Sequence, residues 1–209
     1  LGNELAIVPG DINLMVAGRG IVHYERTPDN VRAVGHTLHL LQLCLALPEP
    51  DEETAPAFYH YDACELPTTE LNGIAIRVMM GQAFGLKSPV KTFAQTLYIE
   101  ADIGAGKSLE IPGEEERAIY VAGGEVEING REVEAFSMAV LETDCVITVK
   151  ESKDSRIALI GGETLTERHL FWNFVSSCKE RLDQSKQNWK NGRFSKVTGD
   201  EEEFIQLPD

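Results

Sequence analysis

The sequence predicts an all-β protein of the closed-barrel or jelly-roll type, followed by one C-terminal α-helix. Short stretches of alternating apolar residues recur at intervals of about 8 to 12 residues between positions 71 and 165, with turn residues between them. Asn129-Gly130 separates two of these stretches, and this dipeptide is the strongest short signal for a β-hairpin. Residues 166–194 change to helical chemistry, with Gly192 as the stop. We therefore expect β-sheets first and a helix afterwards.

Three short strands are predicted at the start of the chain. Residues 5–8 and 12–16 are apolar runs separated by the turn signal Pro9-Gly10-Asp11. Residues 21–26 follow the turn Gly18-Arg19-Gly20 and alternate with period two. This alternation favours an extended strand with two distinct faces.

His23 and Glu25 are the candidate metal ligands. They would share one face of the predicted strand, so an imidazole and a carboxylate could converge on one divalent ion. This pair suits iron or manganese and leaves room for further nitrogen ligands. The alternative interpretation is an ordinary polar strand face that binds no metal.

A further strand is predicted after a polar loop at residues 29–35. Residues 37–47 read T-L-H-L-L-Q-L-C-L-A-L, which is long and apolar enough for a strand buried on both faces. His36 and His39 would point to opposite faces of an extended chain, so they could not easily substitute for missing metal ligands. If they lie in a loop instead, one of them could still reach the site. Gln42 is a candidate for a hydrogen bond to a metal ligand, although a strand Gln is more often structural.

The stretch from Pro48 to Thr69 is rich in Pro, Glu, Asp and Thr and is predicted to be an ordered linker. Phe58, Tyr59 and Tyr61 within it need a packing surface. His60 has no obvious partner at metal-ligand spacing, so we interpret it as a surface or satisfied histidine.

Further strands are predicted at residues 138–141, 145–149 and 156–160. In the tail, Ser177 and Glu180 form a capping-box pattern that opens a helix of about thirteen residues, in which Leu182 and Trp189 share a face. Residues 198–209 are acidic and are expected to be frayed or tied down only by Phe204 and Ile205.

Composition limits the classes of function. The chain has 209 residues, 43% of them hydrophobic and 25% charged, which is typical of a globular protein of one or two domains. Its formal charge of -15 would repel a phosphate backbone, so direct nucleic-acid binding is not expected. No apolar run approaches the length of a membrane helix, and no secretory signal is visible. The true start is expected to have been removed by processing or truncation.

The four cysteines are widely and unevenly spaced, without a C-x-x-C pair. They are predicted to be free thiols in a reducing, cytoplasmic compartment. These cysteines are Cys44, Cys64, Cys145 and Cys178.

Several motifs resemble the pirin family, whose members contain two cupin domains. Pro9-Gly10-Asp11, Ala17-Gly18-Arg19-Gly20 and His23-Tyr24-Glu25 are similar to the second half of the N-terminal cupin. Residues 37–47 resemble the family's Q-L-W-V-N-L-P strand, with Cys44 and Ala46 in place of Trp and Asn. Residues 111–130 resemble a first cupin motif and residues 171–194 the C-terminal segment of bacterial members.

The resemblance implies two jelly-roll domains of unequal completeness. We expect a partial N-terminal cupin over residues 1–48, a linker over 49–70, and a C-terminal cupin with its helix over 71–209. The first half of the N-terminal cupin is expected to be missing. The C-terminal cupin is expected to hold no metal, because Ile111, Pro112 and Gly113 stand where a metal-binding cupin would carry histidines.

The resemblance also implies an iron site. In the family, the residues matching His23 and Glu25 are two of four iron ligands, and the other two come from a His-x-His motif on an earlier strand. This chain contains no His-x-His, so Fe(II) is expected to bind it weakly or not at all.

The activity implied for several family members is a quercetin 2,3-dioxygenase-type oxidation of a flavonol. Here Glu25 would also take the proton of the substrate hydroxyl. The human protein is instead known as a nuclear cofactor of transcription factors, so a non-enzymatic, regulatory protein with protein partners is the alternative. Because missing strands would leave open edges, a homodimer is also expected.

Overall fold

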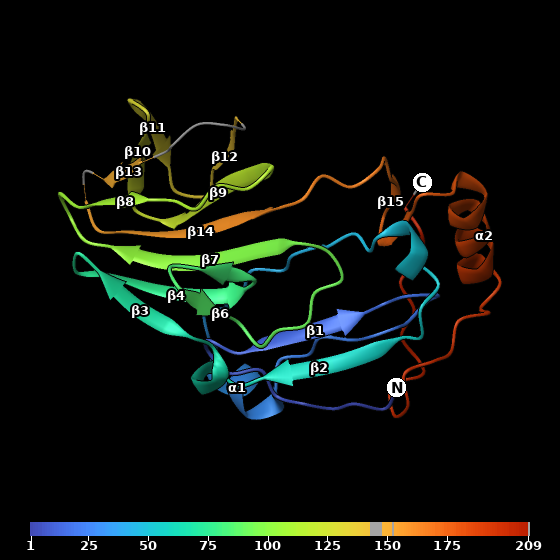
Figure 1. Ribbon diagram of the computed structural model, residues 1–209. Helices are drawn as coiled ribbons and strands as arrows, with labels where there is room; N and C mark the ends of the chain where they lie inside the picture. The colour runs from blue at the N-terminus through green and yellow to red at the C-terminus, as the bar shows by residue number, and fades with distance from the viewer. Residues whose placement is uncertain (143–147, 152, 209) are drawn as a thin grey trace. The chain divides into compact units, whose positions relative to one another are not determined.

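The computed structural model describes residues 1–142, 148–151 and 153–208 and is mostly β, with 36% of residues in strands and 12% in helices (Figure 1). The prediction of an all-β protein with a C-terminal helix is confirmed. The chain divides into two compact units. Unit 1 comprises Leu1–Leu5, Met15–Phe58 and Leu165–Asp209, and unit 2 comprises Ala6–Leu14 and Tyr59–Thr164. The predicted division at residues 48 and 70 stays a prediction.

Unit 2 contains two antiparallel sheets. The larger sheet has the order β12-β9-β14-β7-β4-β3, and its long strands lie side by side in Figure 1. Its strands are β3 (Thr68–Leu71), β4 (Ile74–Met80), β7 (Thr96–Ile103), β9 (Glu116–Gly123), β12 (Met138–Leu141) and β14 (Ser155–Gly162).

The smaller sheet has the order β11-β10-β13-β8. Its strands are β8 (Ser108–Glu110), β10 (Glu125–Ile128), β11 (Arg131–Glu134) and β13 (Thr148–Glu151). The short strands β5 (Gln82–Ala83) and β6 (Leu86–Lys87) form a separate hairpin.

One hydrophobic core joins the two sheets of unit 2. In β7, Leu97, Ile99, Ala101 and Ile103 alternate inward, as the predicted period of two requires. Residues of the smaller sheet, such as Val126, belong to the same cluster. The described strands therefore form a jelly-roll-like sandwich, and the sheets do not close into a barrel.

The local predictions in this region hold. Asn129 and Gly130 have φ angles of 49° and 79°, and they connect β10 to β11 with Ile128 opposite Arg131. Positive φ at both positions is what a two-residue hairpin turn of this type requires. The strand predicted at residues 138–141 is β12, and the strand at 156–160 lies within β14. The strand predicted at 145–149 lies mostly outside the described residues.

Unit 1 is held together by its C-terminal residues. β15 (His169–Phe171) and β16 (Phe174–Ser176) form a hairpin, followed by α2 (Lys179–Lys190). Trp189 on α2 makes an edge contact with Trp172 and stacks on Phe204, and its Nε1 donates a hydrogen bond to the carbonyl of Ile205 (2.8 Å). Phe204 and Ile205 hold the tail as predicted, but not alone, because Asp200 and Glu203 also bond to residues 24–26.

The remaining elements lie in the first third of the chain. β1 (Ile12–Val16) pairs with β2 (Ala57–Tyr61), and both strands cross the boundary between the units. The helical elements are α1 (Asp29–Val34), η1 (Glu49–Asp51) and η2 (Ala63–Glu65). No helix in the described part of the chain is both long and apolar enough to cross a membrane.

Several predicted elements are wrong. Residues 5–8, 21–26 and 37–47 form no strand, and the loop expected at 29–35 contains α1. Strands need a partner, and alternation alone supplies none. Residues 37–47 are irregular and do not form the predicted buried strand, and Leu38 among them is 70% exposed.

The start of α2 also differs from its prediction. The N-cap is Cys178, which makes no side-chain cap. The hydroxyl of Ser177 instead donates to Glu52 (3.0 Å), and so does its backbone N–H (2.8 Å). The predicted capping box therefore does not form, and Ser177 instead bonds to a residue far away in the sequence.

Candidate functional site

The turn before His23 explains the glycines of the motif. Arg19 donates its backbone N–H to the carbonyl of Thr54 (3.1 Å), so a Cβ at Gly18 would lie 2.1 Å from that oxygen. A Cβ at Gly20 would lie 2.9 Å from the Phe194 ring, and both glycines have positive φ. Only glycine fits this close approach without rearrangement.

After this turn, residues 21–28 carry no helix or strand. His23 and Glu25 are exposed, whereas Tyr24 is half-buried. The Tyr24 hydroxyl donates a hydrogen bond to the carbonyl of Glu203. The segment is therefore anchored through Tyr24, while the two predicted ligands face solvent.

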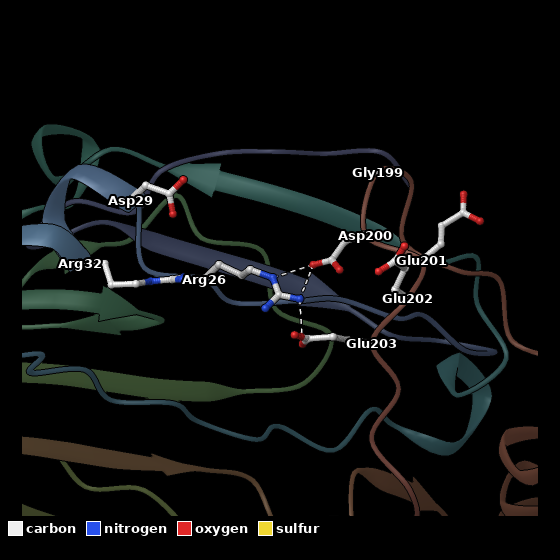
Figure 2. A pocket seen from close by; sticks show the side chains of 8 residues that line it. All are labelled: Arg26, Asp29, Arg32, Gly199, Asp200, Glu201, Glu202 and Glu203. Carbon is white, nitrogen blue, oxygen red and sulfur yellow. Dashed lines mark hydrogen bonds and ion pairs between the residues drawn. The ribbon is translucent and has the colours of Figure 1, made fainter.

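Arg26 anchors the same segment a second time. Figure 2 shows its guanidinium reaching Asp200 and Glu203 on the C-terminal segment, with Nε 2.6 Å from Asp200 Oδ2 and Nη2 2.9 Å from Glu203 Oε2. The hydrogen bonds to Glu203 and Asp200 raise the pKa of Arg26 above its ordinary value. The group is exposed, so salt will screen these interactions.

The other residues predicted near the site are not organised around it. Gln42 is exposed and lies outside any strand, as do His36 and His39. The structure does not bring these side chains to His23 through a shared sheet, because the predicted strand at 37–47 does not form.

His23 and Glu25 alone do not fit a complete iron centre. They offer one imidazole and one carboxylate, whereas the iron sites of non-haem oxygenases have at least three protein donors. Among residues 1–142, 148–151 and 153–208, only one group places three potential donors within 4.8 Å of one another, and that group contains neither residue.

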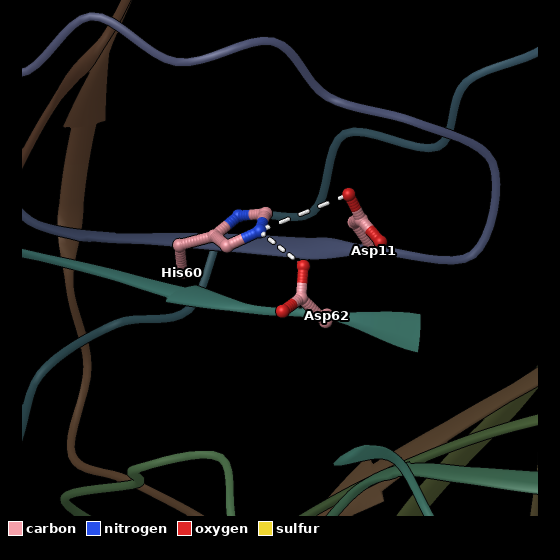
Figure 3. A group of neighbouring side chains, drawn as sticks. All are labelled: Asp11, His60 and Asp62. Carbon is pink, nitrogen blue, oxygen red and sulfur yellow. Dashed lines mark hydrogen bonds and ion pairs between the residues drawn. The ribbon is translucent and has the colours of Figure 1, made fainter. Parts of the chain in front are cut away.

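This group is Asp11, His60 and Asp62, all in unit 2. Figure 3 shows the three side chains converging, with His60 Nε2 3.1 Å from Asp62 Oδ1 and 3.8 Å from Asp11 Oδ2. The prediction that His60 has no partner at metal-ligand spacing is wrong. His60-x-Asp62 repeats the spacing of His23-x-Glu25, which was the available signal, while the approach of Asp11 depends on the pairing of β1 with β2.

Family models match two parts of the chain. The pirin model matches residues 1–45, which contain His23 and Glu25, and the pirin C-terminal cupin domain model matches residues 97–195. A pirin-like protein from Caulobacter vibrioides is 38% identical over the whole chain, which covers 73% of that relative. Pirin from Mus musculus is 34% identical over 88% of the chain, which covers 65% of the mouse protein.

The fold is also similar to solved structures. A crystal structure of quercetin 2,3-dioxygenase from Acinetobacter baumannii matches 97% of this chain with a TM-score of 0.83 and 27% identity, and the chain covers 68% of it. A protein from Geobacillus kaustophilus matches 77% of the chain with a TM-score of 0.68 and 26% identity. The chain thus spans between 65% and 73% of the length of these relatives. On this sequence similarity, the chain belongs to the pirin family.

Proposed function

We propose that this pirin-family chain takes part in a quercetin 2,3-dioxygenase-type oxidation of a small aromatic substrate such as a flavonol. The observation that carries the proposal is the similarity of 97% of the chain to the Acinetobacter quercetin 2,3-dioxygenase. The fold alone would not identify a reaction, so the proposal also rests on the His23-x-Glu25 motif in the part matched by the pirin model.

His23 and Glu25 are assigned as two ligands of Fe(II), which would supply the oxidation chemistry. Glu25 also has the role of a general base, since an exposed carboxylate can accept the proton of a flavonol hydroxyl. Tyr24 and Arg26 position the segment through their contacts with Glu203 and Asp200. Two donors do not hold an iron ion firmly, so a complete centre needs further donors. These further donors are not assigned.

The second candidate is a non-enzymatic protein that binds metal or regulates a protein partner. The incomplete donor set at His23 and Glu25 favours it, because the fold can persist without the chemistry. A cytoplasmic location belongs to both proposals, and the described cysteines Cys44, Cys64 and Cys178 are free and exposed.

Iron analysis followed by quercetin turnover in air with added Fe(II) tests the first candidate. The assay compares the unaltered chain with His23→Ala and Glu25→Gln, and Glu132→Gln on β11 is a matched control because this carboxylate is also exposed. Turnover that is lost in the first two variants and kept in the third supports the dioxygenase. Bound iron without turnover favours the regulatory protein, and absence of both iron and turnover contradicts the assignment of His23 and Glu25 in this chain.

A further inference from the structure

We propose that Asp11, His60 and Asp62 form a binding site for a divalent transition metal, with Zn²⁺ as the preferred ion. The site lies in unit 2 and shares no residue with His23 and Glu25, so it does not depend on the proposed function. His60 lies on β2, Asp62 follows that strand directly, and Asp11 ends the turn before β1 (Figure 3).

The hydrogen bonding of His60 provides the first argument. Its Nδ1 lies 2.7 Å from the side-chain oxygen of Asn13, and the tautomer with its proton on Nδ1 donates to this oxygen. The lone pair of Nε2 then faces two carboxylates, Asp62 at 3.1 Å and Asp11 at 3.8 Å. Three electron-rich atoms that face one another need a cation between them, either a proton or a metal ion.

The distances favour the metal ion. Ligand bonds of about 2.0 to 2.2 Å place neighbouring donors about 3.0 to 3.5 Å apart in octahedral or tetrahedral geometry. The 3.1 Å separation of His60 Nε2 from Asp62 lies within this range, and the 3.8 Å separation from Asp11 is about 0.3 Å longer than its upper end. A proton on Nε2 could bond to Asp62, but 3.8 Å is too long for a hydrogen bond to Asp11.

The ligands are held in place before any ion binds. The Asp11 side chain is only 3% exposed, and it accepts hydrogen bonds from the backbone N–H groups of Ala63 (3.0 Å) and Val8 (3.2 Å). Asp62 caps η2 through a capping box with Glu65. Ordered ligands lose little conformational entropy on binding, and the Asn13 contact orients the His60 ring, as a second hydrogen bond does in known metal sites.

The chemistry of the donors selects the ion. Imidazole nitrogen suits zinc and other transition metals better than calcium or magnesium, and two carboxylates neutralise a charge of +2. The Asp62 side chain is 65% exposed, so water can reach the ion and fill its remaining positions. A bound ion would join the turn before β1 to the end of β2, which is a structural role.

Calorimetric titration with Zn²⁺ tests the site. The chain is first alkylated at its thiols, because the exposed Cys64 lies two residues after Asp62 and could itself bind zinc. Binding of one ion is expected. Asp62→Asn should weaken it about tenfold or more, because the amide keeps an acceptor for the η2 cap but loses the charge. His60→Gln should abolish the binding.

Two control variants separate this site from other donors. His39→Gln removes an exposed imidazole elsewhere, and Glu132→Gln removes an exposed carboxylate on β11. Both should bind Zn²⁺ as tightly as the unaltered chain. A loss of zinc affinity in either control, with no loss in Asp62→Asn, would overturn the site.

A long-range ¹H–¹⁵N spectrum of His60 distinguishes the metal ion from the proton. With Zn²⁺ bound, the Nε2 signal should shift while Nδ1 stays protonated. If the His60 signal does not change when Zn²⁺ is added and shows both nitrogens protonated at neutral pH, a proton and not a metal ion lies between His60 and the carboxylates. The proposal would then be wrong.

Discussion

Tyr98 is a residue whose environment controls stability at high pH. Its buried hydroxyl donates a hydrogen bond to Glu100 Oε1 (2.7 Å), and burial, followed by this contact with Glu100, raises the pKa of Tyr98 well above 10.0. The neutral form is therefore favoured in the folded state. As pH rises above 10, the unfolded chain releases the tyrosine proton while the folded chain retains it, so stability falls.

The change Tyr98→Phe tests this linkage. Between pH 10 and 12, the free energy of unfolding should fall more steeply with pH in the unaltered chain than in Tyr98→Phe. The difference between the two slopes should be about 1.4 kcal/mol per pH unit. Urea unfolding at several pH values measures both slopes. Equal slopes in the two proteins would show that Tyr98 titrates normally when folded.

Glu52 and Glu53 are neighbours in the sequence that differ greatly in burial. Glu52 is 15% exposed and forms an ion pair with Arg168 (2.8 Å) in addition to its contacts with Ser177, whereas Glu53 is 60% exposed and pairs with Arg181. Glu52→Ala should destabilise the protein by about 3 kcal/mol, because it leaves a buried guanidinium uncompensated. Glu53→Ala should cost less than about 1 kcal/mol. Chemical denaturation of both variants measures the loss in free energy of unfolding. Similar losses in the two variants would contradict the argument from burial.

At the scale of single residues, the sequence identified some chemistry and missed the rest. The exposed His23 and Glu25 could be proposed because their spacing and the surrounding glycines form a local motif. His60 could not be assigned partners in the same way, because Asn13 and Asp11 approach it only through the pairing of β1 and β2. The partner of Ser177 could not be predicted for the same reason, since Glu52 is distant in the sequence.

Among the elements, the turns between strands offer a matched pair of glycines. Gly124 and Gly130 have nearly equal φ angles of 78° and 79°. A Cβ at Gly124 would lie 2.3 Å from Ser155 Oγ and 2.4 Å from the carbonyl of Asp154, whereas a Cβ at Gly130 has nothing within 4 Å. Gly130→Ala should therefore show the cost of the backbone conformation alone, about 1 kcal/mol.

Gly124→Ala should cost roughly 1 to 3 kcal/mol more, because Ser155 and Asp154 must move to admit the methyl group. Thermal unfolding of the two variants measures the difference. A Gly124→Ala variant as stable as Gly130→Ala would show that the turn between β9 and β10 adjusts freely.

Elements with local signals were predictable, and those that need distant partners were not. Asn129-Gly130 specifies its own turn, and α2 has its own helical pattern and a stop at Gly192. Residues 21–26 and 37–47 have strand-like patterns, but the structure pairs them with no strand, and the pattern cannot supply that pairing.

At the scale of the whole molecule, the fold class was predictable because it follows from the alternation in the many strands of unit 2.

The apolar residues of 34–45 bear on self-association. Val34, Leu38, Leu40 and Leu45 are all exposed in the single chain. Such a concentration of exposed apolar side chains is typical of an interaction surface, and we expect a second copy of the chain to cover it.

Sedimentation velocity at micromolar concentration should show a dimer. The double variant Leu38→Asp/Leu40→Asp should sediment as a monomer, because charged side chains in the contact would have to be desolvated. Leu170→Asp is the control, since Leu170 is 68% exposed but lies on β15. An unaltered chain that sediments as a monomer would contradict the expectation.

The division of unit 1 between distant parts of the chain has a consequence for its folding during translation. All of unit 2 has been translated once residue 164 is added, whereas unit 1 also needs residues from Leu165 onward. The partners of Tyr24 and Arg26 follow them by 179 and 174 residues. The segment that carries His23 is therefore translated long before these anchors, and unit 2 is complete and free to fold before they are added.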